Sequence, residues 1–204
     1  MIKWIGKLLF LLIFAWVILW FVGAIQSNAT LKNEIIRLHI IANSDSDADQ
    51  AEKIKVRDGV LAFIEEEVGR LPSREDAENY IRTKLADIEK LANQILEENG
   101  SEHTARVKLG LNEFGKRIYE TFTLPSGVYT ALQIEIGEAE GQNWWCVVFP
   151  GLCMPATNNE FCEVAASAGF DEDVIETIAN TGNYKIRLFI LDFFGKIENF
   201  LFKR

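Results

Sequence analysis

The hydrophobic positions along the chain follow first one period and then another, and this divides it into predicted elements. The stretch Leu31–Ala42 is rich in β-branched residues, and its residues 35–41 alternate in the manner of a strand, which predicts a strand there. From about Asp47 to Val68 the apolar residues recur at helical spacing, so a helix is expected there. A second helix is predicted with Ser73 as its N-cap and with Asn99-Gly100 as its end.

Beyond Gly100 the period changes to that of strands. Alternating residues predict a strand over Ala105–Leu111. Two further strands, Ile118–Leu124 and Val128–Ile136, are predicted on either side of the turn Leu124–Gly127. The continuous apolar run Trp144–Phe149 is typical of a central strand, because such a strand is covered on both faces.

The last part of the chain predicts a mixture of short elements. Glu160–Ala168 and Asp171–Asn180 are expected to be short helices, and Tyr184–Phe189 a final strand. A terminal helix should follow, with one face formed by Leu191, Phe194, Ile197 and Leu201. The predicted fold class is therefore α+β, a mainly antiparallel sheet with helices packed on one face, preceded by an N-terminal hydrophobic helix.

The N-terminus differs from the rest. Lys3 and Lys7 precede an uncharged apolar run, Leu8–Ile25, which indicates an export signal or a membrane anchor. As a helix the run would be roughly 27 Å long, within the range of spanning helices, whereas Ser27-Asn28-Ala29 offers small residues for a signal peptidase. Both alternatives remain open for residues 1–29. Residues 30–204 are expected to form a single extracytoplasmic domain.

Charge narrows the function classes. The 204-residue chain carries a net charge of −9, and the leader contributes two lysines and no acid, so the exported body is more acidic still. An acidic surface argues against nucleic acid, whose binding depends on Lys and Arg, and against anionic lipid headgroups. Glycine-rich phosphate loops are absent from the sequence, and no cofactor is expected.

Three cysteines lie in the exported body, where disulfides can persist. Three is an odd number, so at least one is free or pairs between chains. Cys146 and Cys153 are the candidate pair. A two-residue hairpin at Pro150-Gly151 would place Val148 opposite Cys153 and make that bond awkward, whereas a wider loop would permit it.

The same cysteines allow an enzymatic alternative, a cell-envelope hydrolase with Cys146 or Cys153 as nucleophile and His39 or His103 as base. Cys146 lies in an apolar strand, where burial raises a thiol pKa rather than lowering it. We therefore expect no catalytic residue and no enzyme activity. A structural envelope protein held by its N-terminal helix is a third alternative.

The acidic run from Asp45 to Asp49 resembles the start of an EF-hand calcium loop, but the residues that follow do not match the spacing of that motif. Counted from Asp45, position 6 is Gln50 instead of glycine, and position 12 is Val56 instead of glutamate. Zinc motifs are also absent from the sequence. We expect no metal, and the run is interpreted as the cap of the following helix.

Three segments resemble one known family closely: IIRLHIIANSDSDADQ (Ile35–Gln50), FTLPSGVYTALQIEIG (Phe122–Gly137) and GQNWWCVVFPGLC (Gly141–Cys153). They are similar to stage II sporulation protein R of endospore-forming bacteria. Ser126 and Gly151 stand where the family pattern has alanine and proline.

The resemblance implies a signalling protein made in the forespore and exported into the intermembrane space of the septum. Its partner would be a membrane-embedded aspartic protease that processes the precursor of a mother-cell sigma factor. The N-terminus would insert into the membrane at least transiently.

Candidate partner-binding residues come from the predicted strand that holds Arg37 and His39, from the polar loop Asn43–Ser46 that follows it, and from the Phe-Pro turn. The tryptophan pair is added because its two side chains point to opposite faces of a strand, and a surface tryptophan is a typical binding anchor. Arg57 is expected on the apolar side of its helix, buried and paired with Asp45 or Asp58. The full set is Arg37, His39, Asn43, Ser44, Asp45, Ser46, Arg57, Trp144, Trp145, Phe149 and Pro150.

Overall fold

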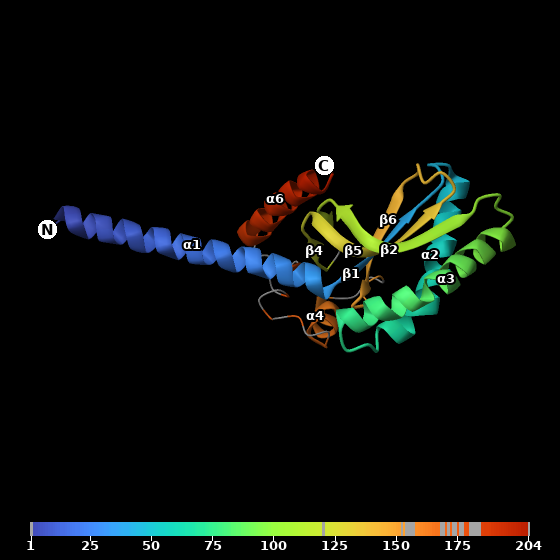
Figure 1. Ribbon diagram of the computed structural model, residues 1–204, viewed down its shortest axis with the longest axis horizontal. Helices are drawn as coiled ribbons and strands as arrows, with labels where there is room; N and C mark the ends of the chain where they lie inside the picture. The colour runs from blue at the N-terminus through green and yellow to red at the C-terminus, as the bar shows by residue number, and fades with distance from the viewer. Residues whose placement is uncertain are drawn as a thin grey trace.

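The computed structural model describes residues 2–119, 121–151, 153, 158–167, 170, 172, 175, 178–179 and 185–203. Its helices are α1 (Ile2–Glu34), α2 (Asp47–Val68), α3 (Arg74–Glu98), α4 (Asn158–Ser167) and α6 (Lys185–Phe202). Its strands are β1 (Ile36–Ile41), β2 (Ala105–Phe114), β3 (Arg117–Ile118), β4 (Thr123–Leu124), β5 (Gly127–Ile136) and β6 (Asn143–Phe149). Figure 1 shows α1 projecting from the body. The helices α2 and α3 lie on the side of the body away from α1.

Four strands form the main sheet in the order β2-β5-β1-β6. β2 is antiparallel to β5 and β6 is antiparallel to β1, whereas β1 and β5 are parallel. β3 and β4 pair in a separate two-stranded sheet. The predicted fold class, α+β with a mostly antiparallel sheet and an N-terminal helix, is confirmed.

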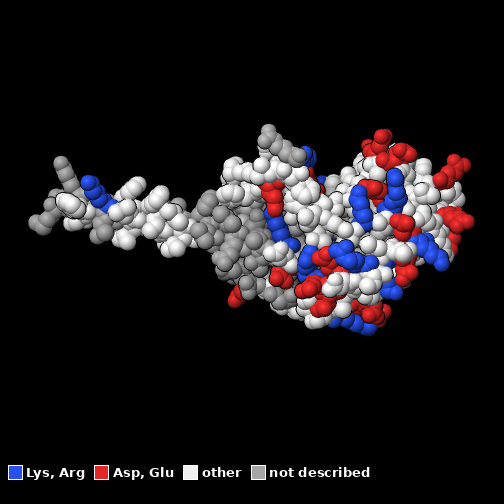
Figure 2. Space-filling view, in the orientation of Figure 1, with Lys and Arg blue, Asp and Glu red and all other residues white. Residues whose placement is uncertain are grey.

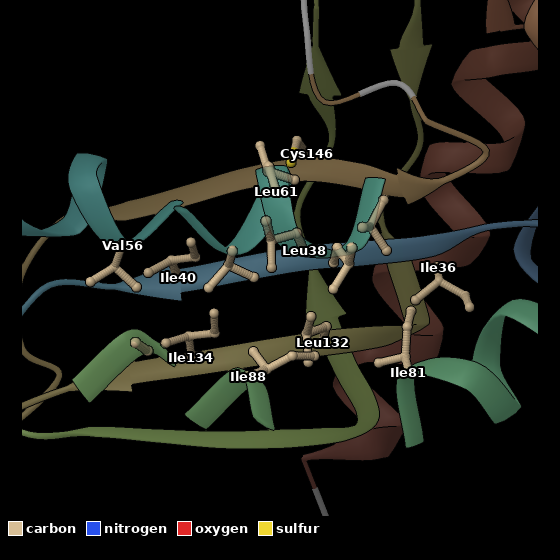
Figure 3. Packing of buried hydrophobic residues seen from close by; sticks show 14 of the residues in the cluster. Ile36, Leu38, Ile40, Val56, Leu61, Ile81, Ile88, Leu132, Ile134 and Cys146 are labelled. Carbon is tan, nitrogen blue, oxygen red and sulfur yellow. The ribbon is translucent and has the colours of Figure 1, made fainter. Parts of the chain in front are cut away.

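The first core cluster lies between this sheet and the pair α2 and α3 (Figure 3). β1 contributes Ile36, Leu38 and Ile40, which alternate along the strand and are fully buried. They pack with β5 side chains and with the apolar stripes of the two helices, including Val56, Ile64, Ile81 and Ile88. Both helices begin as predicted, because the hydroxyl oxygens of Ser46 and Ser73 accept the amides of Asp49 and Asp76.

A second core cluster covers the opposite face of the sheet. Tyr129 and Ala131 of β5 and Val147 of β6 point to this side. They pack with residues from outside the sheet, among them Leu31, Phe122, Ala165 and Phe170. The sheet is thus buried on both faces, which explains the near-continuous burial of β5.

Two boundaries differ from the sequence prediction. The strand expected from Leu31 begins only at Ile36, because α1 continues to Glu34 and carries Leu31 into the second cluster. The strand expected over Tyr184–Phe189 is wrong, since α6 begins at Lys185. Leu191 of α6 is buried while Ile197 and Leu201 are exposed, so the expected common face does not pack as one surface.

Two strand predictions also change. Trp144–Phe149 is at the edge of the sheet among the described strands, instead of at its centre. Among its described residues, the stretch Ile118–Leu124 holds the end of β3 and the whole of β4. These two strands are antiparallel, and the Tyr119 amide donates to the Phe122 carbonyl at 2.8 Å in the turn between them. The helix predicted over Asp171–Asn180 lies mostly outside the described residues, and Glu160–Ala168 corresponds to α4.

α1 carries many exposed apolar side chains, including Trp4, Phe10, Ile13 and Trp16. In the part of the chain that the structure describes, no helix has both the length and the apolar character needed to cross a membrane.

Candidate partner-binding surface

The three segments that carry the family resemblance come together in space. They supply β1, β5 and β6, which are neighbours in the main sheet. In the register His39 lies opposite Trp145 on one side and opposite Gln133 on the other. Residues spread over more than a hundred positions of sequence therefore form one three-stranded unit.

The polar loop before α2 is organised around the carboxylate of Asp49. Asn43 Nδ2 and Ser44 Oγ donate to Asp49 Oδ2 at 2.9 and 2.5 Å, and the Asp49 amide donates to Ser46 Oγ at 3.1 Å. The hydrogen bonds from Ser44 and Asn43 lower the pKa of Asp49 to about 2. Three of the predicted partner-binding residues, Asn43, Ser44 and Ser46, therefore hold the loop in shape.

The same loop also fixes the segment that leads into β6. Asp45 Oδ1 accepts the amide of Gln142 at 2.7 Å, and Asn43 Oδ1 accepts the amide of Glu138 at 3.0 Å. Lys53 of α2 donates to the Gln142 carbonyl at 2.9 Å. Asp45 and Ser46 themselves remain exposed. The loop thus ties β6 to the start of α2 and leaves two polar side chains at the surface.

Trp144 and Trp145 lie on opposite faces of β6, and each ring is covered by an arginine. Arg57 Cζ of α2 lies 4.2 Å from the centroid of a Trp144 ring, and Arg117 Cζ of β3 lies 3.3 Å from that of Trp145. Both indoles are half-buried. Arg117 was missed by the sequence analysis, since nothing in the pattern shows that β3 folds over β6.

Arg57 does not occupy the predicted buried position. Its side chain is partly exposed and binds Asp58, with Nε 2.7 Å from Oδ1. Of the two predicted partners of Arg57, Asp58 does pair with it. Asp45 does not, because its carboxylate accepts the amide of Gln142. Arg57 therefore lies at the edge of the α2–sheet interface. Its guanidinium packs on the Trp144 ring and does not enter the core.

The buried arginine is Arg37 of β1, which has no exposed surface. Its Nη2 donates to the Tyr119 hydroxyl at 2.8 Å, and its guanidinium lies 3.8 Å from the Phe114 ring and 5.0 Å from the Tyr129 ring. Within the described part of the chain, Nε and Nη1 have no hydrogen-bond partner. Burial lowers the pKa of Arg37 below its ordinary value.

His39 lies on the same face as Arg37. Its Nε2 is 2.6 Å from Asn143 Oδ1, and its ring stacks on Trp145 at a centroid distance of 5.7 Å. Burial lowers the pKa of His39. The imidazole therefore fixes the β1–β6 register, and Asn143, which sequence reasoning did not single out, is its partner.

Phe149 and Pro150 are both buried, so neither presents a free apolar side chain at the surface. The peptide bond between them is cis. With Glu65, Gly69, Leu71, Val164 and Ser167 they line a pocket of about 240 Å³. Cys146 and Cys153 are joined by a disulfide that closes this turn, and Cys162 of α4 is a free thiol.

One group of potential metal ligands occurs among the described residues. Asp49, Glu52 and His103 each bring one donor atom within 4.8 Å of the others. Internal partners already occupy them: Asp49 accepts from the capping loop, Glu52 accepts from Ser101 Oγ at 2.9 Å, and His103 Nε2 lies 3.3 Å from Asp49. The cluster is explained by the packing of the loop before β2 on α2.

Comparison with known proteins identifies a family that includes the segments forming this surface. The family model of stage II sporulation protein R matches residues 32–159, which contain β1 to β6 and the arginine–tryptophan pairs. Stage II sporulation protein R of Bacillus subtilis (strain 168) is 39% identical over 123 residues, covering 60% of this chain and 55% of that relative. No solved structure matches significantly. The match spans more than half of the chain and includes all three segments of the β5-β1-β6 unit, and the chain accordingly belongs to the stage II sporulation protein R family.

Proposed function

We propose that this protein is an exported sporulation signal, delivered from the forespore into the space between the septal membranes. There it activates a membrane-embedded aspartic protease that processes the precursor of a mother-cell sigma factor. The apolar segment within residues 1–29 directs export. Family membership supports the sporulation role, and the identity of the partner is part of the proposal.

One observation indicates which surface would contact the protease. The edge strand of the β5-β1-β6 unit, β6, has a tryptophan covered by an arginine on each of its faces. Tryptophan and arginine are the residues most enriched at binding hot spots, because they combine large apolar area with directed hydrogen bonding. Arg57 with Trp144 and Arg117 with Trp145 therefore form the proposed contact, which we call the arginine–tryptophan edge. Asp45 and Ser46 lie at the loop packed against the start of β6.

Such a surface can activate a protease without chemistry of its own. A ligand that binds the active conformation more tightly than the inactive one shifts the equilibrium by its difference in binding free energy. Shifting a protease from 1% to 99% active requires about 5.5 kcal/mol of that difference. A few well-buried tryptophan and arginine contacts, each of about 2 kcal/mol or more, supply it.

The disulfide disfavours the hydrolase alternative. A cysteine nucleophile acts as a thiolate, and both cysteines of the candidate pair are bonded to each other. His39 is engaged by Asn143 on one side and stacked on Trp145 on the other.

Coexpression in a heterologous bacterium tests the function. The full chain would be produced with the membrane protease and a tagged sigma-factor precursor, and precursor cleavage followed by immunoblot. Arg57→Ala and Arg117→Ala should each reduce cleavage, and Trp144→Ala should abolish it. Arg82→Ala is the matched control, because Arg82 is an exposed arginine on α3 that pairs with Glu78 at 2.7 Å.

Secreted amounts and thermal melts of each variant separate binding from folding. Cleavage that is unchanged by the full chain would overturn the proposed function. Activation that persists in stable, exported Arg57→Ala and Trp144→Ala proteins would instead move the contact away from the arginine–tryptophan edge.

A further inference from the structure

The C-terminal helix α6 has its apolar side turned outward. Phe189, Phe193, Ile197, Phe200 and Leu201 recur at helical spacing and are 69, 54, 41, 63 and 61% exposed. Surface helices of globular proteins turn such a stripe toward the core. A contiguous exposed apolar face of this kind indicates contact with something other than water.

The inner side of α6 carries its polar groups. Asp192 Oδ1 accepts the Ser126 amide at 3.1 Å and the Ser126 hydroxyl at 2.6 Å. Glu198 forms an ion pair with Lys32 of α1 and accepts the Val128 amide at 3.2 Å. Asn199 Nδ2 donates to the Phe114 carbonyl at 2.9 Å. These contacts fix the rotation of the helix, so the outward direction of the phenylalanines is built into the packing.

Gly195 strengthens this point. A Cβ at this position would collide with the backbone carbonyl of Ser126, so the helix backbone lies directly on the turn before β5. The helix cannot rotate its aromatic side toward the sheet without losing this close approach and the Asp192 contacts.

The charge of α6 differs from that of the body. From Lys185 to Arg204 the sequence holds five basic and two acidic residues, in a chain of net charge −9. Both acids make inward contacts, and Asp192 Oδ2 also pairs with Lys196 Nζ at 2.9 Å. Lys203 Nζ lies 3.3 Å from Glu113 Oε2 of β2, and both lysine side chains remain mostly exposed beside these partners. An aromatic and aliphatic face flanked by lysines is the pattern of a helix that lies in a membrane interface.

The position of α6 agrees with this pattern. Figure 1 shows α6 beside α1, at the end of the body away from α2 and α3. Exposed apolar side chains run along α1 as well. In Figure 2 the surface over α6 is mainly uncharged, whereas charged side chains gather over the opposite end. The apolar faces of the two helices therefore lie at the same end of the molecule.

We propose that α6 is a membrane-surface helix, whose Phe189, Phe193 and Phe200 enter the acyl-chain boundary of a bilayer containing anionic lipid. This inference stands independently of the proposed partner. It also lies outside the region matched by the family model, which ends at residue 159. Residues 185–204 carry a net basic charge in the sequence, whereas acidic groups of the body that lie further away than about 10 Å are screened by salt.

Depth-dependent quenching tests the proposal on the full chain. In a Cys162→Ser background, single cysteines at Phe193 or Phe200 would carry the fluorophore NBD, with Leu111→Cys on β2 as the exposed control. The protein would be reconstituted into vesicles of phosphatidylcholine and phosphatidylglycerol that contain doxyl-labelled lipid. NBD at 193 and 200 should lose fluorescence to the doxyl groups and shift to the blue, and NBD at 111 should do neither.

Two further arms separate the sources of the signal. Lys196→Gln with Lys203→Gln, or vesicles of phosphatidylcholine alone, should reduce the quenching at 193. Labels at 193 and 200 that behave like the label at 111 would overturn the proposal. Self-quenching between copies that is independent of lipid would overturn it as well and would assign the face to a second copy of the chain.

Discussion

The guanidinium of Arg37 lies against the ring of Phe114, with Cζ 3.8 Å from the ring centroid. Tyr129 lies on the same guanidinium at 5.0 Å, and Tyr119 supplies its one hydrogen-bond acceptor among the described residues. A buried charge held by aromatic rings and one hydroxyl is poorly compensated. We therefore expect the charge of Arg37 to contribute little to the stability of the fold.

Replacing Arg37 by methionine should therefore leave the free energy of unfolding unchanged or raise it by about 1 to 4 kcal/mol, because the desolvated charge disappears while the volume is kept. Arg37→Ala should lower it by about 2 kcal/mol or more, since a cavity remains. Thermal and chemical unfolding of the full chain in non-ionic detergent micelles measures both. A methionine variant as unstable as the alanine variant would show that the charge itself holds the fold.

The Asp49 carboxylate should make stability depend on pH at the acid end. Its pKa in the folded protein is about 2, below the ordinary value of 3.8, so the unfolded chain binds the proton more readily. The stabilisation is complete above the unfolded pKa and is lost as the pH falls through the folded pKa.

Asp49→Asn should accordingly lower the free energy of unfolding at pH 7, by on the order of 2 kcal/mol for charged hydrogen bonds. The gap between variant and parent should narrow as the pH falls from about 5 to about 2. Denaturant titrations across this range check it. Asp47→Asn, at an exposed position of the same helix turn, is the control. A gap that stays constant with pH would contradict the capping role of the charge.

The Cys146–Cys153 bond closes a short loop of sequence separation 7. Cys153→Ser should cost about 2 to 3 kcal/mol by the loop-entropy relation. The melting temperature of the parent should fall on adding reductant, and that of the variant should stay where it is. Cys162→Ser is the matched control because Cys162 is free. Equal sensitivity of parent and variant to reductant would count against this role.

Arg57 should contribute only modestly to the free energy of unfolding, since its ion pair with Asp58 lies at the surface and its contact with Trp144 is half-exposed. Arg57→Ala is expected to lower the free energy of unfolding by about 1 kcal/mol. A double-mutant cycle with Trp144→Ala should show a coupling of about 0.5 to 2 kcal/mol for the stacking. A loss of about 3 kcal/mol or more would instead indicate a buried charge pair.

Local signals in the sequence determined the elements that depend only on neighbouring residues. α2 lies where the helical period predicted it, over Asp47–Val68, and Ser73 caps α3. Strand alternation placed β2 and β5. These succeed because hydrogen bonding within a helix, capping and the two faces of a strand are set within a few residues. The family fingerprint was visible for the same reason, as three contiguous stretches.

Tertiary packing decided the rest. Arg37 and Arg57 both stand among apolar residues in the sequence. In the structure the rings of Phe114 and Tyr129 pack on Arg37, which is fully buried, whereas Arg57 stays partly exposed beside Asp58. Tyr184–Phe189 has strand-like residues, yet α6 begins at Lys185 and is fixed by Ser126, Val128 and Lys32, all distant in sequence. The sequence determined which faces are apolar, and the contacts between distant segments decided which of those faces became core and which remained at the surface, because burial depends on what packs against a face and not on the face alone.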